Sequence, residues 1–318
     1  MTLPPSDHFN GKTFFNPQHV NRTWREVMQW RRTSKPAPWP AQVALTAQPP
    51  PPAPRGREIV ATWINHATFL LQTPQGNILT DPQFSARCGP FGLAGPRRVH
   101  PPGVALADLP RIDLILLSHD HYDHCDLASL RALARAHQDS VAITPLRNRD
   151  LLARAGLRAI VELDWWQAHQ PAAGLKVTVT PSRHWSNRLS GRRNGRLWGG
   201  FHLQFADRAC WFAGDTGYDA ALFPAIREKL GAPDLAMIPI GAYEPRWFMS
   251  AQHCNPAEAI QIHHDVGART SLAMHWGTWQ LTDEGREEPV AALAAARTAA
   301  GLAPEAFRAL TPGESVTV

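Results

Sequence analysis

The chain has 318 residues, of which 44% are hydrophobic, and it carries a formal net charge of +5 at pH 7. This length allows a large buried core, arranged as one domain or as two halves. No run of about 18 apolar residues occurs, so a membrane-spanning helix is not expected. The opening MTLPPSDHFNGKTFFNP lacks the apolar stretch of a signal peptide. The positive charge favours anionic partners in general and names none of them.

Proline dominates the first part of the chain. Residues 1–55 hold 11 of the 29 prolines, and residues 20–31 are the one stretch there with a helical pattern. Because proline lacks a backbone N–H and restricts φ, such a segment cannot build a sheet or a long helix of its own. We therefore expect residues 1–55 to be an extension packed on a main domain formed by residues 56–318.

The main domain is expected to open with a hairpin, in which residues 59–71 and 77–80 flank the turn Thr73-Pro74-Gln75-Gly76. Apolar runs predict further strands, and longer periodic segments predict helices. The expected strands are 112–117, 175–180, 209–213 and 270–274, and the expected helices are 127–137, 149–155, 220–230, 256–266 and 289–300. The helix at 256–266 is well marked, because Asn255, Pro256 and Glu258 form a capping-box pattern.

A cluster of metal-type ligands follows the strand at 112–117 directly. The segment SHDHYDH (118–124) contains His119, His121, Asp123 and His124 within six positions. One tight loop is not expected to direct four such groups at a single tetrahedral ion, but it can divide them between two neighbouring ions. The motif therefore indicates a binuclear metal site.

Three further candidate ligands stand where predicted strands end and loops begin. They are His184 after 175–180, Asp215 after 209–213, and His275 after 270–274. A sheet holds the backbone rigid at such positions while the loops leave space for a substrate. A binuclear site needs about seven protein ligands, and these three complete that number.

The four cysteines, Cys88, Cys125, Cys210 and Cys254, form no CxxC pair. We expect free thiols in a reducing compartment, and therefore a cytoplasmic protein. Cys125 directly follows His124; a thiolate ligand is conceivable there, and we interpret the residue as a bystander.

Several longer strings carry a resemblance to a known family. The cluster of His and Asp residues is similar to that of the metallo-β-lactamase superfamily, and the strings resemble its N-acyl-phosphatidylethanolamine phospholipase D branch. The resemblance runs from about Thr62 to Thr278. The strings are WINHATFLLQT, PSRHWSNR, LWGGF, FAGDTGY, GAYEPRWFM, HCNPAEAI and MHWGT.

The resemblance implies an α/β fold, the four-layer αββα sandwich of that superfamily, with residues 56–318 as the catalytic domain. It also implies two sets of metal ligands joined by one bridging carboxylate. His119, His121 and His184 would hold the first ion, Asp123, His124 and His275 the second, and Asp215 would bridge them. Zinc suits imidazole and carboxylate ligands, and iron or manganese is compatible with them as well.

The implied reaction is hydrolysis of a phosphodiester by a metal-bridging hydroxide, which yields a phosphomonoester and an alcohol. Asp123 is expected to orient the nucleophile, and His253 matches a family position near the substrate phosphate, where it could donate a proton. A helix-entry histidine with a local hydrogen bond is an equal alternative for His253.

Basic and aromatic residues are the candidates for substrate binding, because guanidinium groups bind phosphate oxygens and aromatic rings suit an amphiphilic molecule. Arg188 opens a run that continues with Arg192, Arg193 and Arg196, although such runs are often solvated surface. The candidates are Trp185 and Arg188 on one loop, and Tyr243 and Trp247 on another. A phospholipid or another small anionic molecule is the expected partner.

Two other classes of function stay open. One is a different hydrolase on the same site, such as a lactonase for a sugar acid or a nuclease. Nuclease relatives usually add an inserted domain, whereas the 60 positions from His124 to His184 are expected to hold only two helices and two strands. The other is a non-catalytic metal-binding protein, a class that tends to lose ligands. Peripheral contact with the inner membrane and dimerisation, known in the family, are open as well.

Overall fold

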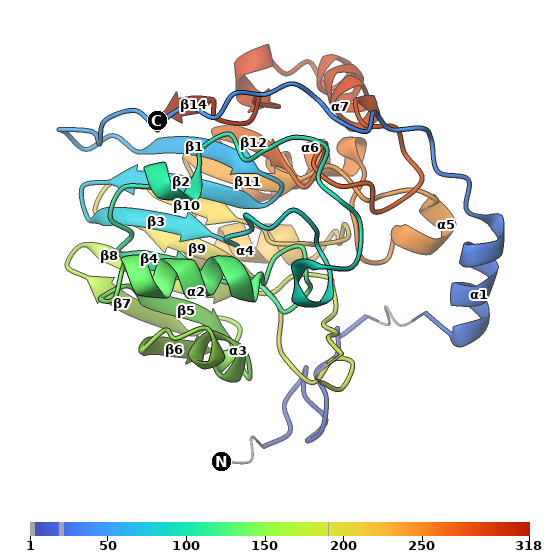
Figure 1. Cartoon of the computed structure of the whole chain (residues 1–318), viewed down its shortest axis with the longest axis horizontal. Coiled ribbons are helices and arrows are strands. Elements are labelled where there is room, and N and C mark those ends of the chain that lie inside the picture. Colours follow the sequence, from blue (N-terminus) through green and yellow to red (C-terminus); the bar gives the residue numbers. More distant parts are fainter. Residues whose placement is uncertain (1–3, 19–21, 190) are drawn as a thin grey trace.

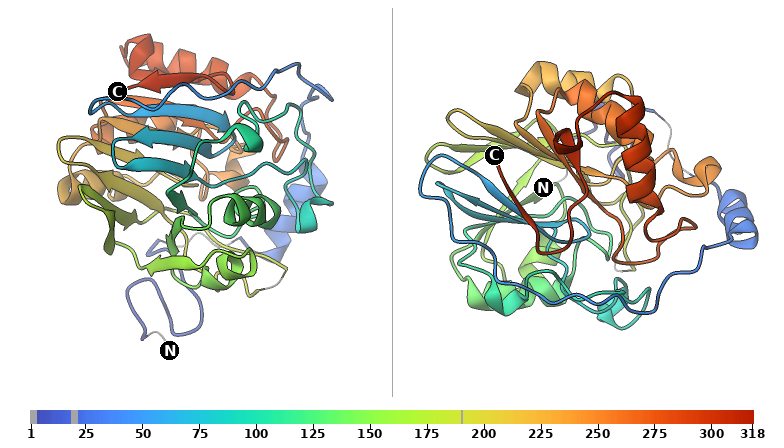
Figure 2. Two further views of the ribbon diagram at one scale, coloured as in Figure 1. Left: turned by 60° about the vertical axis from the view of Figure 1, so that its left-hand side comes forward. Right: turned by 90° about the horizontal axis from the view of Figure 1, so that it is seen from above.

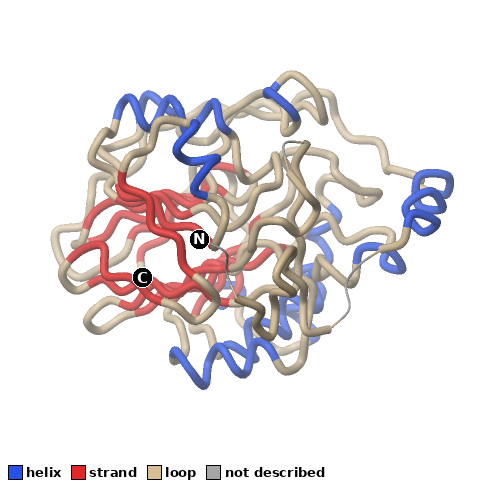
Figure 3. The backbone as a smooth tube through the Cα atoms, turned by 90° about the horizontal axis from the view of Figure 1, so that it is seen from below, coloured by secondary structure: helices blue, strands red, loops and turns tan. Residues whose placement is uncertain are grey.

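The computed structural model describes residues 4–18, 22–189 and 191–318 of the chain. Two seven-stranded sheets lie face to face, with helices outside each of them, as the view from above in Figure 2 shows. This is the four-layer α/β sandwich expected from the sequence, and Figure 3 shows the same separation of strands and helices from below.

Each sheet combines parallel and antiparallel strands (Figure 1). The first runs in the order β14 (Ser315–Thr317), β1 (Val60–Asn65), β2 (Thr68–Thr73), β3 (Gly76–Thr80), β4 (Leu114–Leu116), β5 (Val141–Pro145) and β6 (Ala159–Leu163). The second runs in the order β13 (Phe307–Arg308), β12 (Thr270–Met274), β11 (Leu235–Pro239), β10 (Ala209–Phe212), β9 (Gly200–Gln204), β8 (Leu175–Thr180) and β7 (Ala168–Ala172).

Helices cover the outer faces of both sheets. Helices α2 (Leu127–Ala136) and α3 (Arg149–Arg154) lie outside the first sheet, and α4 (Leu222–Leu230), α6 (Pro256–Val266) and α7 (Glu288–Ala299) lie outside the second. Two other helices, α1 (Trp24–Thr33) and α5 (Arg246–Met249), stand side by side away from the sheets. No helix of the described residues is long and apolar enough to cross a membrane.

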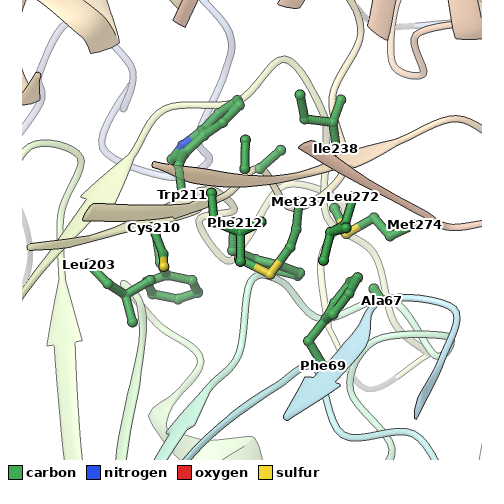
Figure 4. Close-up of a cluster of buried hydrophobic side chains, with 14 of the residues drawn as sticks. Ala67, Phe69, Leu203, Cys210, Trp211, Phe212, Met237, Ile238, Leu272 and Met274 are labelled. Carbon is green, nitrogen blue, oxygen red and sulfur yellow. The ribbon is translucent and has the colours of Figure 1, made fainter. Parts of the chain in front are cut away.

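The main core fills the space between the sheets. Phe69 of β2 faces Phe212 of β10 and Met237 of β11 across this space (Figure 4). A second cluster of buried side chains, including Ile115 of β4 and Leu130 of α2, lies between the first sheet and its helices. Burial of apolar area on this scale fixes the two sheets against each other, and so fixes the loops at their edges.

Residues 59–71, expected as one strand, form two. The chain turns at His66 and Ala67, so that β1 and β2 pair antiparallel with Trp63 opposite Phe69. His66 adopts a positive φ of 44°. The prediction was wrong because every residue of both strands is buried, which removes the alternation of polar and apolar residues that would mark the break.

The interval from His124 to His184 also differs from expectation. It holds two helices, as predicted, but four strands rather than two. Strand β7 (AHQPA) carries little apolar pattern, whereas β6 (AIVEL) is largely apolar. The expected hairpin turn at Thr73–Gly76, the strands β8 and β12 and the capping box of α6 are confirmed.

The N-terminal segment runs along the surface of the two-sheet unit. Backbone hydrogen bonds join Phe14 to Asn194, Val43 to Val99, and Gln48 to Gly103. Helix α1 begins at its own capping box, formed by Thr23 and Glu26. The four cysteines are unpaired and buried.

Candidate metal centre

The candidate ligands meet at one edge of the sandwich because the strands that carry them point the same way. Strands β10 and β12 both lie parallel to β11. Strand β8 is antiparallel to β9, which is antiparallel to β10, so β8 and β10 share a direction. The loops after β8, β10 and β12 therefore open on the same side, where they meet the loop that follows β4.

Three imidazoles form the first group of ligands. The Nε2 atoms of His119 and His184 lie 2.9 Å and 3.1 Å from Nδ1 of His121. Oδ2 of Asp215 lies 3.8 Å from the first of these Nε2 atoms and 3.6 Å from the second. Ligands bound to one zinc ion at about 2.0–2.1 Å stand about this far from one another.

A second group lies on the other side of Asp215. Its Oδ2 atom is 3.2 Å from Nε2 of His124 and 3.1 Å from Nε2 of His275. Oδ2 of Asp123 is 3.5 Å and 3.3 Å from the same two nitrogen atoms. One carboxylate oxygen thus lies within reach of four imidazoles, two from each group.

The chemistry of these donors fits metal ions. Asp215 Oδ1, His124 Nε2 and His275 Nε2 are buried and have no hydrogen-bond partner. Burying polar atoms in this way is costly unless an ion or a substrate satisfies them. The candidate ligand atoms of the first group and Asp215 lie within 4.8 Å of one another, as do those of Asp123, His124 and His275 together with His66.

Burial keeps the first group neutral, which is the state in which imidazole binds a metal. It lowers the pKa of His121 to about 3 and that of His184 to about 4. Burial also opposes the charge on Asp215, but the facing His124 and His275 hold the pKa of that carboxyl well below its usual value. The first group thus offers neutral imidazoles, whereas in the second group Asp215 and Asp123 outweigh burial and raise the pKa of His124 well above its ordinary value and that of His275 to about 9.

Two buried residues that the sequence did not single out support these ligands. His66, in the turn between β1 and β2, lies with Nε2 3.0 Å from Oδ2 of Asp123. Asp81, at the end of β3, accepts a hydrogen bond from Nδ1 of His124 at 2.7 Å and another from the hydroxyl of Ser118 at 2.5 Å. Asp81 could have been found from the sequence, because like Asp215 it is a carboxylate at the end of a predicted strand. Nothing in the sequence marks His66.

A cavity of about 490 Å³ opens above the centre. Its floor includes His121, Asp123, Asp215 and His275, and its walls combine apolar and cationic side chains. The wall residues include Arg22, Val27, Trp30, Pro90, Trp185, Leu189, Arg193, Phe248 and Met249.

Of the four residues predicted to bind substrate, two line the cavity and two do not. The ring of Trp185 lines the cavity 4.6 Å from that of His121. Arg188 also lines it, but its Nη1 donates to the backbone carbonyls of Asp120 and Cys125, both at 2.8 Å. Tyr243 is outside the described lining, and its hydroxyl donates to Glu288 at 3.3 Å. Trp247 is also outside the described lining; it is 42% exposed and packs against Phe248.

His253 lies within the cavity. Its ring centroid is 5.0 Å from that of His184 and 5.4 Å from that of His275. Its Nδ1 is buried without a partner, and burial lowers its pKa well below the ordinary value. Nδ1 of His253 therefore forms no local hydrogen bond.

Comparisons with known proteins agree with this geometry. A model of the β-lactamase superfamily domain matches residues 76–276. The chain is also 38% identical over 240 residues to N-acyl-phosphatidylethanolamine-hydrolyzing phospholipase D 1 of Caenorhabditis elegans, a match that covers 73% of this chain and 67% of that protein. The chain belongs to the β-lactamase superfamily.

A second named phospholipase D and a solved structure are also similar to this chain. The mitochondrial N-acyl-phosphatidylethanolamine-hydrolyzing phospholipase D of Saccharomyces cerevisiae is 35% identical over 233 residues, covering 72% of this chain and 49% of the yeast protein. The match thus spans about two thirds of the nematode relative and about half of the yeast one. A solved metallo hydrolase from Ignicoccus hospitalis has the same fold, with a TM-score of 0.61 at 22% identity, over 82% of this chain and 98% of that one.

The resemblance drawn from the sequence is therefore confirmed. Superfamily membership, relatives named as hydrolases and the two groups of candidate ligands together make the chain a metal-dependent hydrolase of the α/β class.

Proposed function

We propose that the chain is a phosphodiesterase of the N-acyl-phosphatidylethanolamine phospholipase D type, working with two divalent metal ions. The position of Asp215 carries this proposal. Its Oδ2 atom lies between two groups of imidazoles, 3.1–3.2 Å from His275 and His124 and 3.6–3.8 Å from His184 and His119. A carboxylate so placed suits a pair of ions better than a single one.

The residues divide between the two ions as the resemblance implies. His119, His121 and His184 would hold one, Asp123, His124 and His275 the other, and Asp215 would contact both. Bound zinc, iron or manganese would polarise the scissile phosphate and lower the pKa of a water molecule. Asp123 faces the cavity and could orient that water, while neutral His253 could hydrogen-bond a phosphate oxygen.

The walls of the cavity favour an amphiphilic anion as substrate. Arg22 and Arg193 bring positive charge, and Val27, Leu189 and Phe248 bring apolar surface. Arginine matches phosphate oxygens, and the apolar wall suits a hydrocarbon chain next to them. A phospholipid carries both features in one molecule.

Exposed apolar side chains on the segments that line the cavity support contact with a lipid surface. Trp24 and Met28 lie on α1, Leu189 on the lining itself, and Phe91 directly after lining residue Pro90. We expect the protein to sediment with vesicles that contain anionic phospholipid and to stay in solution with vesicles of neutral lipid alone. This contact would suit a cytoplasmic protein that is peripheral to the inner membrane. If the supernatants from the anionic and the neutral vesicles contained equal amounts of protein, both the lipid contact and this localisation would be contradicted.

Substrate choice separates the proposal from its alternatives. Protein stripped of metal and then reloaded with zinc, manganese or iron should hydrolyse bis(p-nitrophenyl) phosphate and N-acyl-phosphatidylethanolamine in mixed micelles. Lactone opening without phosphodiester turnover would favour a lactonase. Bound metal with neither activity would favour a non-catalytic protein.

A further inference from the structure

Helix α1, from the proline-rich N-terminal segment, forms part of the wall of the cavity above the metal centre. Arg22, just before the helix, and Val27 and Trp30 within it all line the cavity. Val27 and Trp30 are three positions apart, so they share one face of the helix. That face is turned toward the same space as His121 and Asp123.

The helix is seated on α5 through one aromatic residue. The rings of Trp30 and Phe248 stack with centroids 5.0 Å apart and an interplanar angle of 4°. Arg22 donates from Nε to the carbonyl of Phe248 at 2.8 Å, and its guanidinium lies 5.4 Å from the centroid of the same ring. At the other end, the Ser34 hydroxyl donates to Asp283 at 2.5 Å.

The apolar face of α1 is incompletely covered by protein. None of the ten residues of the helix is buried, although Val27 and Trp30 face the cavity. An apolar chain inside the cavity would cover this face and remove its apolar surface from water, which favours binding. The helix therefore offers the hydrocarbon part of a ligand a surface that Phe248 covers only in part.

The same wall carries polar groups for the oxygen-rich part of a ligand. Nε1 of Trp30 is buried and has no hydrogen-bond partner, which leaves one N–H available. The side chain of Arg22 is 17% exposed and shares its charge with Glu26, whose Oε1 lies 3.2 Å from Nη1. An N–H donor and a guanidinium beside an apolar face match ester, amide or phosphate oxygens next to a hydrocarbon chain.

We propose that α1 is a specificity-determining wall of the active site, in which Trp30 and Arg22 select amphiphilic phosphodiesters over small ones. This inference rests on the proposed phosphodiesterase function. The N-terminal segment is then part of the substrate site as well as a covering of the surface. Trp30 packs against the substrate chain and donates to a neighbouring oxygen, and Arg22 supplies positive charge at the same wall.

Paired substrates and matched variants test the proposal. Trp30→Ala and Arg22→Gln should each lower kcat/KM for long-chain N-acyl-phosphatidylethanolamine about tenfold, mainly through KM, because contacts of this kind act on binding. Turnover of bis(p-nitrophenyl) phosphate should change less than about twofold. The controls Gln29→Ala and Arg25→Gln alter exposed residues of the same helix that lie outside the cavity lining.

Conservative variants show whether Trp30 and Arg22 recognise the substrate or only hold α1 in place. Trp30→Phe keeps the stacked ring and loses the N–H, and Arg22→Lys keeps the charge. Each should recover part of the preference for N-acyl-phosphatidylethanolamine over bis(p-nitrophenyl) phosphate that Trp30→Ala and Arg22→Gln lose. Thermal unfolding of the Trp30 variants should stay close to that of the wild type, because no residue of α1 is buried. Arg22 lies before the helix and donates to the carbonyl of Phe248, so its variants are compared below their own unfolding midpoints.

Binding without turnover provides an independent readout. Calorimetry should show that wild-type protein binds dodecyl phosphate, kept below its critical micelle concentration, more tightly than inorganic phosphate, and that Trp30→Ala removes most of this difference. Equal losses on both substrates, or unchanged binding of dodecyl phosphate, would overturn the role of α1. If the wild type hydrolyses neither phosphodiester, the proposed function fails, and the binding difference still decides whether α1 recognises an amphiphilic anion.

Discussion

His66 shows how a residue outside the ligand set can control it. Its imidazole is 1% exposed, it contacts Oδ2 of Asp123 at 3.0 Å, and its backbone carbonyl accepts the N–H of His275 at 2.9 Å. It therefore holds one candidate ligand by its side chain and another by its main chain. Replacing residues that orient metal ligands in this way commonly lowers the affinity for the metal about 10–100-fold.

We accordingly expect His66→Ala to weaken metal binding about 10–100-fold while the protein remains folded. Competition with a chelator of known affinity measures the effect. His264→Gln, at an exposed position of α6, is the control and should leave the affinity unchanged. An affinity equal to that of the wild type would show that His66 only fills the turn between β1 and β2.

The arginine run illustrates what a sequence pattern cannot resolve. Arg188 is 7% exposed, and its guanidinium lies 4.0 Å from the centroid of the Tyr122 ring. Arg196 pairs with Asp150 at 2.9 Å. Arg193 lines the cavity beside Trp185. These three similar residues thus serve different purposes, because burial and partners depend on the folded loop.

Arg188→Ala should therefore act first on stability. Loss of its two hydrogen bonds would leave the carbonyls of Asp120 and Cys125 unsatisfied, at a cost of about 1–3 kcal/mol in the free energy of unfolding. Urea titration measures this cost. Arg192→Ala, at an exposed position, should be neutral. A raised KM with unchanged stability would instead support the substrate role expected from the sequence.

The strands that end at the candidate ligands could be predicted from the sequence. The short helix and the turn next to the cavity could not. Strands β8 and β12 have the expected bounds, since each combines an apolar run with a clear end. Helix α5 has only four residues, and the turn at His66 interrupts a fully buried run, so neither leaves a periodic signal. The convergence of the seven candidate ligands followed from strand ends, while the contribution of α1 to the cavity required the fold.

The start of α6 gives a quantitative test at this scale. Asn255 accepts a hydrogen bond from the backbone of Glu258 at 2.8 Å, and the Glu258 side chain accepts from the backbone of Asn255 at 2.9 Å. Asn255→Ala should lower the free energy of unfolding by about 1 kcal/mol, as measured in urea. Gln261→Ala on the exposed face of the helix should have a much smaller effect. Equal effects would show that the capping box does not stabilise α6.

For the whole molecule, the resemblance implied the sandwich, and the structure adds how the N-terminal segment is attached to it. His8 anchors that segment, with its two ring nitrogens 2.6 Å from Asp7 and 2.7 Å from Asp164 and its ring stacked on Trp165. Burial opposes its charge, but the two carboxylates raise the pKa of His8 above its ordinary value of 6.5.

Because the pKa is raised in the folded state, protonated His8 stabilises the protein fully below pH 6.5, and this contribution is lost as the pH rises through the folded-state pKa. We expect His8→Asn to lower the midpoint of thermal unfolding more at pH 5.5 than at pH 9. Hydrogen exchange of residues 4–18 should rise over the same range in the wild type. A difference that does not depend on pH would mean that His8 is held by stacking alone.

The central claim is that two metal ions meet at Asp215, and the metal content of the purified protein tests it most directly. Mass spectrometry of wild-type protein reloaded with zinc should find two ions per chain. Asp215→Ala should hold fewer than half as many and lose essentially all phosphodiester hydrolysis. A wild type that never binds more than trace metal, or an Asp215→Ala variant that retains both ions and full turnover, would contradict the account.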